Sequence, residues 1–133
     1  MDRCTRRASV AAVIVASHAI IYAENAELTR AFLRDVLDLP NVDVNDGWLI
    51  FKLPPAELGV HPTGEGGPVS GAHQLFLMCD DIVATVAELV AKGVQFLTPV
   101  EDQGFGRVTT MKVPGGGVLG LYQPSHQTAY DLD

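Results

Sequence analysis

The stretch GAHQLFLMCDD, residues 71–81, decides the fold, because an earlier stretch of the chain has the same pattern. VASHAIIYAEN, residues 15–25, also has a histidine that is followed by an apolar run and then by acid or amide residues. His18 and His73 are 55 residues apart, and so are Asn25 and Asp80. A short apolar run before an acid or amide predicts a buried strand and then the N-cap of a helix. The sequence therefore predicts one structural unit that is used twice.

The first unit continues with a helix and short strands. After Asn25, apolar residues recur at helical spacing: Leu28, Phe32, Val36 and Leu37. Pro40 predicts where this helix ends. The segment after Pro40 alternates apolar runs with turn residues, and Asn45–Gly47 is typical of a hairpin turn. We expect an opening strand within residues 13–23 and later strands over residues 41–44, 48–53 and 56–62.

The second unit shows the same order of signals. Asp80 or Asp81 is expected to cap a helix over residues 82–93, whose apolar stripe is Ile82, Val86, Leu89 and Val90. Lys92 and Gly93 are residue types that helix C-termini prefer. The strands predicted around this helix cover residues 73–79, 94–100, 107–113 and 118–124.

Each half is thus predicted to be a βαβββ module, and the fold class to be α+β. The modules are expected at residues 10–62 and 72–124, with a linker rich in glycine and proline at 63–71 and a tail at 125–133. One helix covers only one face of a four-stranded sheet. We therefore expect two curved mixed sheets that enclose a cleft between their open faces.

The composition and net charge of the chain argue against some classes of binding partner. The 133 residues are 47% hydrophobic and 19% charged, with a net charge of −7, so nucleic acid and anionic membranes are not expected as partners. Cys4 and Cys79 are too few for a disulfide framework and are read as free thiols in the cytoplasm. The basic, then apolar N-terminus is similar to a secretory signal, but it continues into the expected first strand without a convincing cleavage site. No apolar run reaches the ~18 residues that a membrane span needs.

The chain resembles the vicinal oxygen chelate superfamily, which includes glyoxalase I, extradiol dioxygenases and bleomycin resistance proteins. The most specific likeness is GFGRVTTMKVPGGGVLGLYQP, residues 104–124, with its aromatic-glycine turn, its Pro-x-Gly hairpin and its final Gln-Pro. SHAIIYAENAELTRAFLRDVLDL, residues 17–39, is also typical. The resemblance covers residues 13–124 and implies the paired-module fold.

The resemblance also implies where a metal would be bound. In metal-using members the first strand of a module supplies a histidine, which corresponds to His18 and His73 here. The fourth strand supplies a carboxylate in many members, and the matching positions here are Gly59 and Gly120. The sequence therefore predicts an incomplete set of ligands. A divalent metal (Fe, Mn, Zn or Ni) held by His18 and His73 stays an open expectation.

Other side chains are expected to line the cleft. Residues two apart on a strand face the same side, which places His61 with Gly59 and Tyr122 with Gly120. Glu57 and His126, which lies in the polar tail, are assigned no role. The aromatic side chains expected to stack on a ligand are Trp48, Phe51 and Phe76.

Two functions remain open at this point, and the sequence does not decide whether the chain is an enzyme. A protein with an incomplete metal set that binds a small molecule fits the missing carboxylates. A divalent-metal enzyme (a dioxygenase, lyase or isomerase) acting on vicinal oxygens fits the retained histidines. The apolar run at residues 8–16 is longer than one short strand needs, which favours pairing with a second copy in a homodimer.

Overall fold

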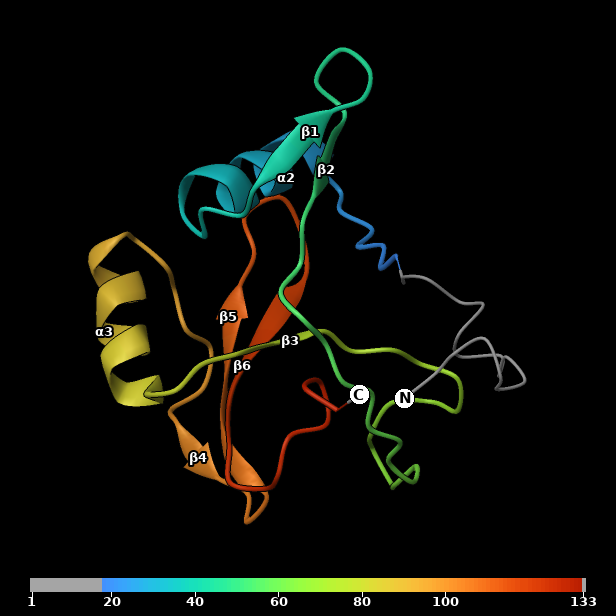
Figure 1. The fold of residues 1–133 in the computed structure, drawn as a ribbon, viewed down its shortest axis with the longest axis vertical. Helices are drawn as coiled ribbons and strands as arrows, with labels where there is room; N and C mark the ends of the chain where they lie inside the picture. Colours follow the sequence, from blue (N-terminus) through green and yellow to red (C-terminus); the bar gives the residue numbers. More distant parts are fainter. Residues whose placement is uncertain (1–17, 133) are drawn as a thin grey trace, which may run out of the picture.

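A computed structural model describes residues 18–132. The second half contains β3 (Phe76–Met78), α3 (Ile82–Ala91), β4 (Glu101–Asp102), β5 (Gly106–Lys112) and β6 (Val118–Pro124). The sheet order is β3-β6-β5-β4, and only the β3–β6 pair is parallel. The predicted α+β class and the βαβββ order of this half are confirmed (Figure 1). Within residues 18–132, no helix is both long and apolar enough to cross a membrane.

Capping contacts and one glycine fix the two ends of helix α3. The Asp81 carboxylate accepts the Ala84 N–H at 3.1 Å, so Asp81 is the N-cap. The Gln123 side chain accepts the Ile82 N–H at 2.8 Å, which ties the start of the helix to the end of β6. Gly93 has a φ of 93°, the left-handed conformation that stops a helix.

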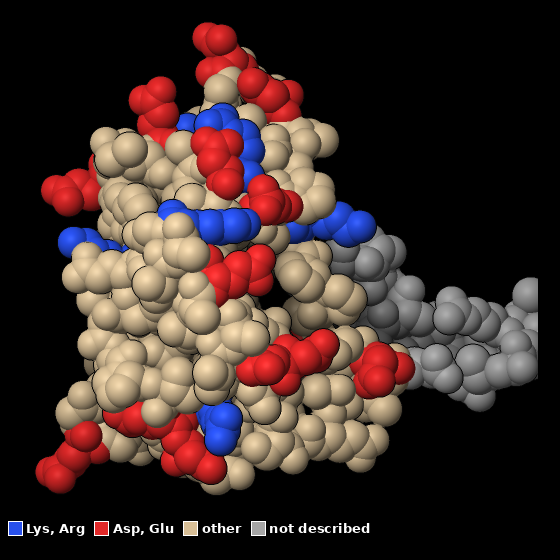
Figure 2. Space-filling view, turned by 90° about the vertical axis from the view of Figure 1, so that its left-hand side faces the viewer, with Lys and Arg blue, Asp and Glu red and all other residues tan. Residues whose placement is uncertain are grey.

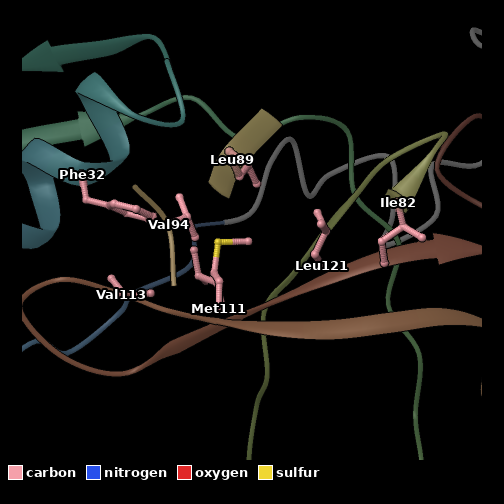
Figure 3. Packing of buried hydrophobic residues seen from close by; sticks show 8 residues of the cluster. Phe32, Ile82, Leu89, Val94, Met111, Val113 and Leu121 are labelled. Atoms are coloured by element: carbon pink, nitrogen blue, oxygen red, sulfur yellow. The ribbon is translucent and has the colours of Figure 1, made fainter. Parts of the chain in front are cut away.

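The hydrophobic core lies between α3 and one face of this sheet (Figure 3). Ile82 and Leu89 of α3 are buried with Met111 of β5 and Leu121 of β6. Each fully buried side chain of this size stabilises the fold by about 1.5–3 kcal/mol. The opposite face of the sheet is left without a helix, and it carries the candidate site.

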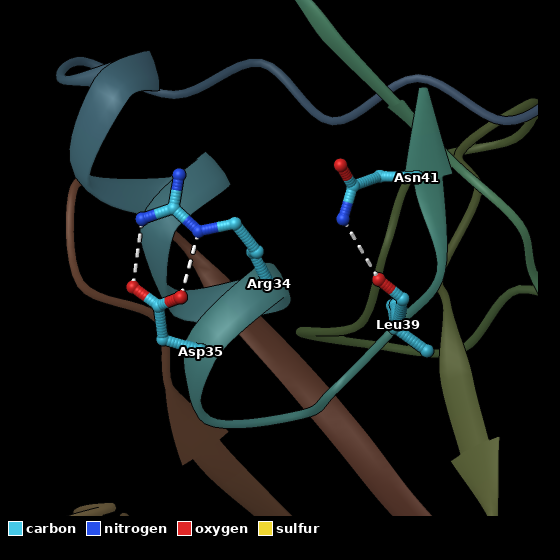
Figure 4. A network of polar contacts seen from close by, with 4 residues as sticks. All are labelled: Arg34, Asp35, Leu39 and Asn41. Carbon is cyan, nitrogen blue, oxygen red and sulfur yellow. Dashed lines mark hydrogen bonds and ion pairs between the residues drawn. The ribbon is translucent and has the colours of Figure 1, made fainter. Parts of the chain in front are cut away.

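The first half contributes α2 (Ala26–Asp35), β1 (Asn41–Asp43) and β2 (Leu49–Phe51), and the two strands pair antiparallel. Asn25 caps α2 as predicted, since its side chain accepts the Leu28 N–H. In the last turn of α2, Arg34 forms a forked ion pair with Asp35, and after the helix the Asn41 amide donates to the Leu39 carbonyl (Figure 4). Both contacts are exposed and contribute little to stability.

The predicted apolar stripe of α2 needs one correction. Leu28 is 52% exposed, whereas Thr29 is buried beside the β5–β6 turn. The Thr29 hydroxyl donates to the Pro114 carbonyl at 2.8 Å, and the Asn25 N–H donates to the Gly115 carbonyl at 2.7 Å. A polar residue is thus buried because the turn of the second half offers it an acceptor. These two bonds join the halves.

Three predicted strands differ in the structure. Residues 18–23 and 56–62 lie in no strand, and residues 13–17 of the expected opening strand fall outside the described part. A strand forms only where a neighbour satisfies its backbone groups, and the β1–β2 pair gains no further strand among residues 18–132. The strand expected over 94–100 is reduced to one bridge, Phe96 to Met111, because Pro99 has no N–H to donate.

Candidate functional site

Two glycines shape the open face of the four-stranded sheet. Leu119 and Leu121 of β6 are buried in the core, so Gly120 and Tyr122 face the other way. Phe76 pairs with Gly120, and a Cβ on Gly120 would overlap the Phe76 ring. A Cβ on Gly106 would likewise overlap the Tyr122 ring. Two aromatic rings therefore lie close against the strands, where the glycines leave room for them.

Five rings form what we call the aromatic cluster: His61, Phe76, Phe105, Tyr122 and His126. The Tyr122 ring centroid is 6.2 Å from that of Phe76 and 5.9 Å from that of Phe105. Its distance to the His126 ring is also 5.9 Å, and His61 meets Phe105 edge-on at 5.9 Å. These separations are typical of favourable aromatic contacts. Tyr122 is thus the centre of the cluster.

The Tyr122 phenol is held in place and stays protonated. Its hydroxyl donates to the Phe105 carbonyl at 3.0 Å. Partial burial raises the pKa of this phenol, and the negative charge of Glu57 raises it further. At neutral pH the group is therefore a hydrogen-bonded wall of the site and does not serve as a base.

Glu57 and His126 complete one edge of the cluster. One Glu57 oxygen accepts the Ala129 N–H at 2.7 Å, and the other lies 3.6 Å from His126 Nε2. His126 Nδ1 lies 2.7 Å from the Gln127 carbonyl oxygen. The chain that follows β2 therefore meets the C-terminal segment beside β6, an arrangement that can be followed in Figure 1.

The structure brings three of the predicted ligand-binding residues together and separates two. His61, Phe76 and Tyr122 belong to the aromatic cluster. Trp48 lies at the β1–β2 hairpin, with the Arg30 guanidinium 4.5 Å above its ring. Phe51 alternates with Ile50 on β2 and so shares a face with Leu49, which lies opposite α2.

The two histidines predicted to hold a metal, His18 and His73, stand at exposed positions. His73 lies three residues before β3. The residue that pairs with Gly120 is Phe76, whose ring covers the position where the family resemblance implies a carboxylate. Within residues 18–132, nowhere do three or more His, Cys, Asp or Glu side chains gather closely enough to hold a metal ion.

Three residues of the candidate site were not among the predicted site residues. Glu57 is assigned no role in the sequence analysis, although it stands two residues before Gly59 and strand alternation would place it on the same side as Gly59 and His61. His126 was set aside as part of a polar tail, yet its ring contacts Tyr122. Phe105 carried a signal, because it stands between two glycines in the 104–106 turn, where an aromatic side chain has no core to enter.

Two hollows lie away from the aromatic cluster. One of about 690 Å³ lies between the start of α2 and the turn at Gly115–Gly117, and one of about 290 Å³ lies between α2 and the β1–β2 hairpin. Both are lined mainly by charged side chains, small residues and backbone. We place the site at the aromatic cluster because aromatic side chains with a few polar groups are what small-molecule sites use.

The surface charge is consistent with the composition. Figure 2 shows acidic side chains over the whole height of one side of the molecule, with basic ones mainly in a band across the upper half. No broad basic patch appears on this face.

Comparisons with known proteins agree with the fold. The sequence profile of the Glyoxalase/Bleomycin resistance protein/Dioxygenase superfamily matches residues 15–125. No curated protein matches significantly. The chain is similar to the structure of an antibiotic binding protein from Streptomyces sp. CB03234 (24% identity, 82% of this chain and 100% of the other, TM-score 0.55).

Two further solved structures are similar. One is a superfamily member from Sphaerobacter thermophilus DSM 20745 (24% identity, 84% of this chain and 98% of the other, TM-score 0.59). The other is lactoylglutathione lyase from Agrobacterium tumefaciens (18% identity, 82% and 92%, TM-score 0.57). At these identities the likeness establishes the fold alone.

Proposed function

Because the chain belongs to the Glyoxalase/Bleomycin resistance protein/Dioxygenase superfamily, we propose that it binds a small molecule at the aromatic cluster without carrying out chemistry on it. The observation that carries this proposal is the Phe76 ring over Gly120. This ring occupies the space beside position 120, where the family resemblance implies a metal-binding carboxylate, and presents an aromatic surface there. One similar structure is described as an antibiotic binding protein, which supports binding as a role for this fold.

Exposure of the cluster supports the same conclusion. Phe76 is 41% exposed and Phe105 is 45% exposed, although both are large apolar residues. Adjacent exposed aromatic residues on a sheet face mark a contact surface, since their apolar area is otherwise left in water. Rings at these separations offer faces and edges to a planar ligand.

The alternative is a divalent-metal enzyme with His18 and His73 as ligands. It requires the exposed His73 and the N-terminal region to approach a common ion. Lewis-acid activation of vicinal oxygens would then be the chemistry of the metal. Metal analysis of protein purified without a histidine tag tests this alternative, because near-stoichiometric metal would favour the enzyme.

Nuclear magnetic resonance titration with a panel of planar aromatic compounds tests binding. Amide signals near Phe76, Phe105 and Tyr122 should shift in a saturable way. Phe76→Ala should weaken binding about tenfold, as expected when a ring that stacks on the ligand is removed. Trp48→Ala is the matched control, because Trp48 is aromatic and exposed but stacks with Arg30. Equal losses in both variants would contradict this location.

We also propose that the chain forms a homodimer. Leu58 and Val60 are 91% and 87% exposed, and Ile20 and Tyr22 are exposed as well. These residues stand where the first module was expected to have its first and last strands, and among residues 18–132 they have no strand partner. A second copy supplying the missing strand neighbours would bury this apolar surface.

A further inference from the structure

We propose that the molecule bound at the aromatic cluster carries a cationic amine, and that Glu57 is the residue that selects it. This inference rests on the proposed binding function and adds the chemical class of the ligand. Three observations lead to it: the surroundings of the Glu57 carboxylate, the hydrogen bond made by His126, and the rings that surround Tyr122.

The Glu57 carboxylate is mostly buried and lacks a permanent cation. Its side chain is only 16% exposed, and the ion pairs of residues 18–132 give it neither lysine nor arginine as a partner. One oxygen accepts the Ala129 N–H, so that oxygen is satisfied. The second oxygen faces His126 Nε2 at 3.6 Å, which is too long for a hydrogen bond.

The second oxygen gains no donor from a neutral His126. A carbonyl oxygen only accepts, so the contact of His126 Nδ1 with the Gln127 carbonyl places the ring proton on Nδ1. Nε2 of the neutral imidazole then presents a lone pair toward the carboxylate. A carboxylate oxygen in a partly buried site, facing a lone pair, is stabilised by any cation that can donate to it.

The neighbouring rings are suited to the same kind of group. Tyr122 is close enough to Glu57 for the carboxylate charge to act on its phenol, and the Phe76, Phe105 and His126 rings surround it. An ammonium within about 6 Å of an aromatic face is attracted by the ring quadrupole. Rings together with one carboxylate thus match a ligand with an aromatic body and a positive amine. The net charge of −7 favours the approach of such a ligand.

Three probes with the same aromatic body separate the effects: 2-naphthylmethylammonium, neutral 2-naphthylmethanol and anionic 2-naphthoate. Titrations followed by amide signals should give the order ammonium, alcohol, carboxylate, from tightest to weakest. Glu57→Gln should weaken the ammonium probe about tenfold and leave the alcohol unchanged, because the glutamine oxygen still accepts the Ala129 N–H while the charge is lost. Glu88→Gln, at an exposed position of α3, controls for the loss of one negative charge.

The outcomes are distinct. If the alcohol binds as tightly as the ammonium, or if Glu57→Gln and Glu88→Gln weaken the ammonium equally, the amine preference is wrong while the binding function stands. If none of the three probes shifts the signals of the cluster, both the inference and the proposed function are overturned. Thermal melts of each variant confirm that the fold is retained.

Discussion

The Phe76 ring lies over Gly120, the residue with which Phe76 pairs between the parallel strands β3 and β6. This relationship connects the fold with the function. In the family resemblance, position 120 is where the last strand would supply a carboxylate to a metal. Here an aromatic ring has taken that space, so the open face of the sheet is an apolar surface with a carboxylate, Glu57, at its edge.

Adding a side chain at position 120 should therefore destabilise the protein. Gly120→Ala places a methyl group into the Phe76 ring, and we expect a loss of about 1–3 kcal/mol in the free energy of unfolding, measured with urea. In a Phe76→Ala background the same change should cost little. Gly64→Ala, which meets only open space, is the control. Equal costs of Gly120→Ala in both backgrounds would contradict the overlap.

The junction between the halves should depend on one hydroxyl. Thr29→Val keeps the shape but removes the donor to the Pro114 carbonyl, so we expect a destabilisation of about 1–3 kcal/mol in urea unfolding. Thr29→Ser keeps the hydroxyl and loses one methyl group. It should therefore be the milder change, and a serine variant less stable than the valine variant would argue against the bond.

The Cys79 thiol should ionise at higher pH in the folded chain than in the unfolded chain. Burial raises the pKa of this thiol, and the negative charges of Asp80 and Asp81 add to the effect. The folded state holds the proton more tightly, so this contribution to stability is complete below the unfolded pKa and is lost as the pH rises through the folded one.

Alkylation rates measured against pH check this direction. In a Cys4→Ser background, the midpoint for native protein should lie above the midpoint in urea, and Asp80→Asn should lower the native midpoint. Identical native and unfolded profiles would show that Cys79 is not shielded.

The exposed apolar segment around Leu58 should control self-association. Light scattering from micromolar to millimolar protein should report a dimer. Val60→Asp should shift the protein toward monomer, because burying an unpaired charge in the interface is costly. Val83→Asp, on the exposed side of α3, is the matched control and should leave the mass unchanged. A wild-type chain that is monomeric throughout this range would reject the homodimer.

The second half was predictable because its signals are local and agree with one another. Asp81 before an apolar stripe and Gly93 after it mark α3, and β6 covers the predicted residues 118–124. The first half was harder to predict, because residues 56–62 have strand-like composition but no neighbour to pair with among the described residues. What brings Glu57 to the site is its contact with the C-terminal segment, which no strand pattern predicts.

The sequence by itself determined the α+β class, the βαβββ order of the second half, the caps of both helices and the absence of carboxylates at Gly59 and Gly120. Each of these features depends on residue types and on their spacing over a few residues, so it can be predicted from the local sequence. Only the tertiary structure decided that Phe76 covers Gly120, that Phe105 and His126 surround Tyr122, and that Glu57 meets the C-terminal segment. Those contacts depend on strand register and on how distant segments pack, and no local pattern in the chain encodes either.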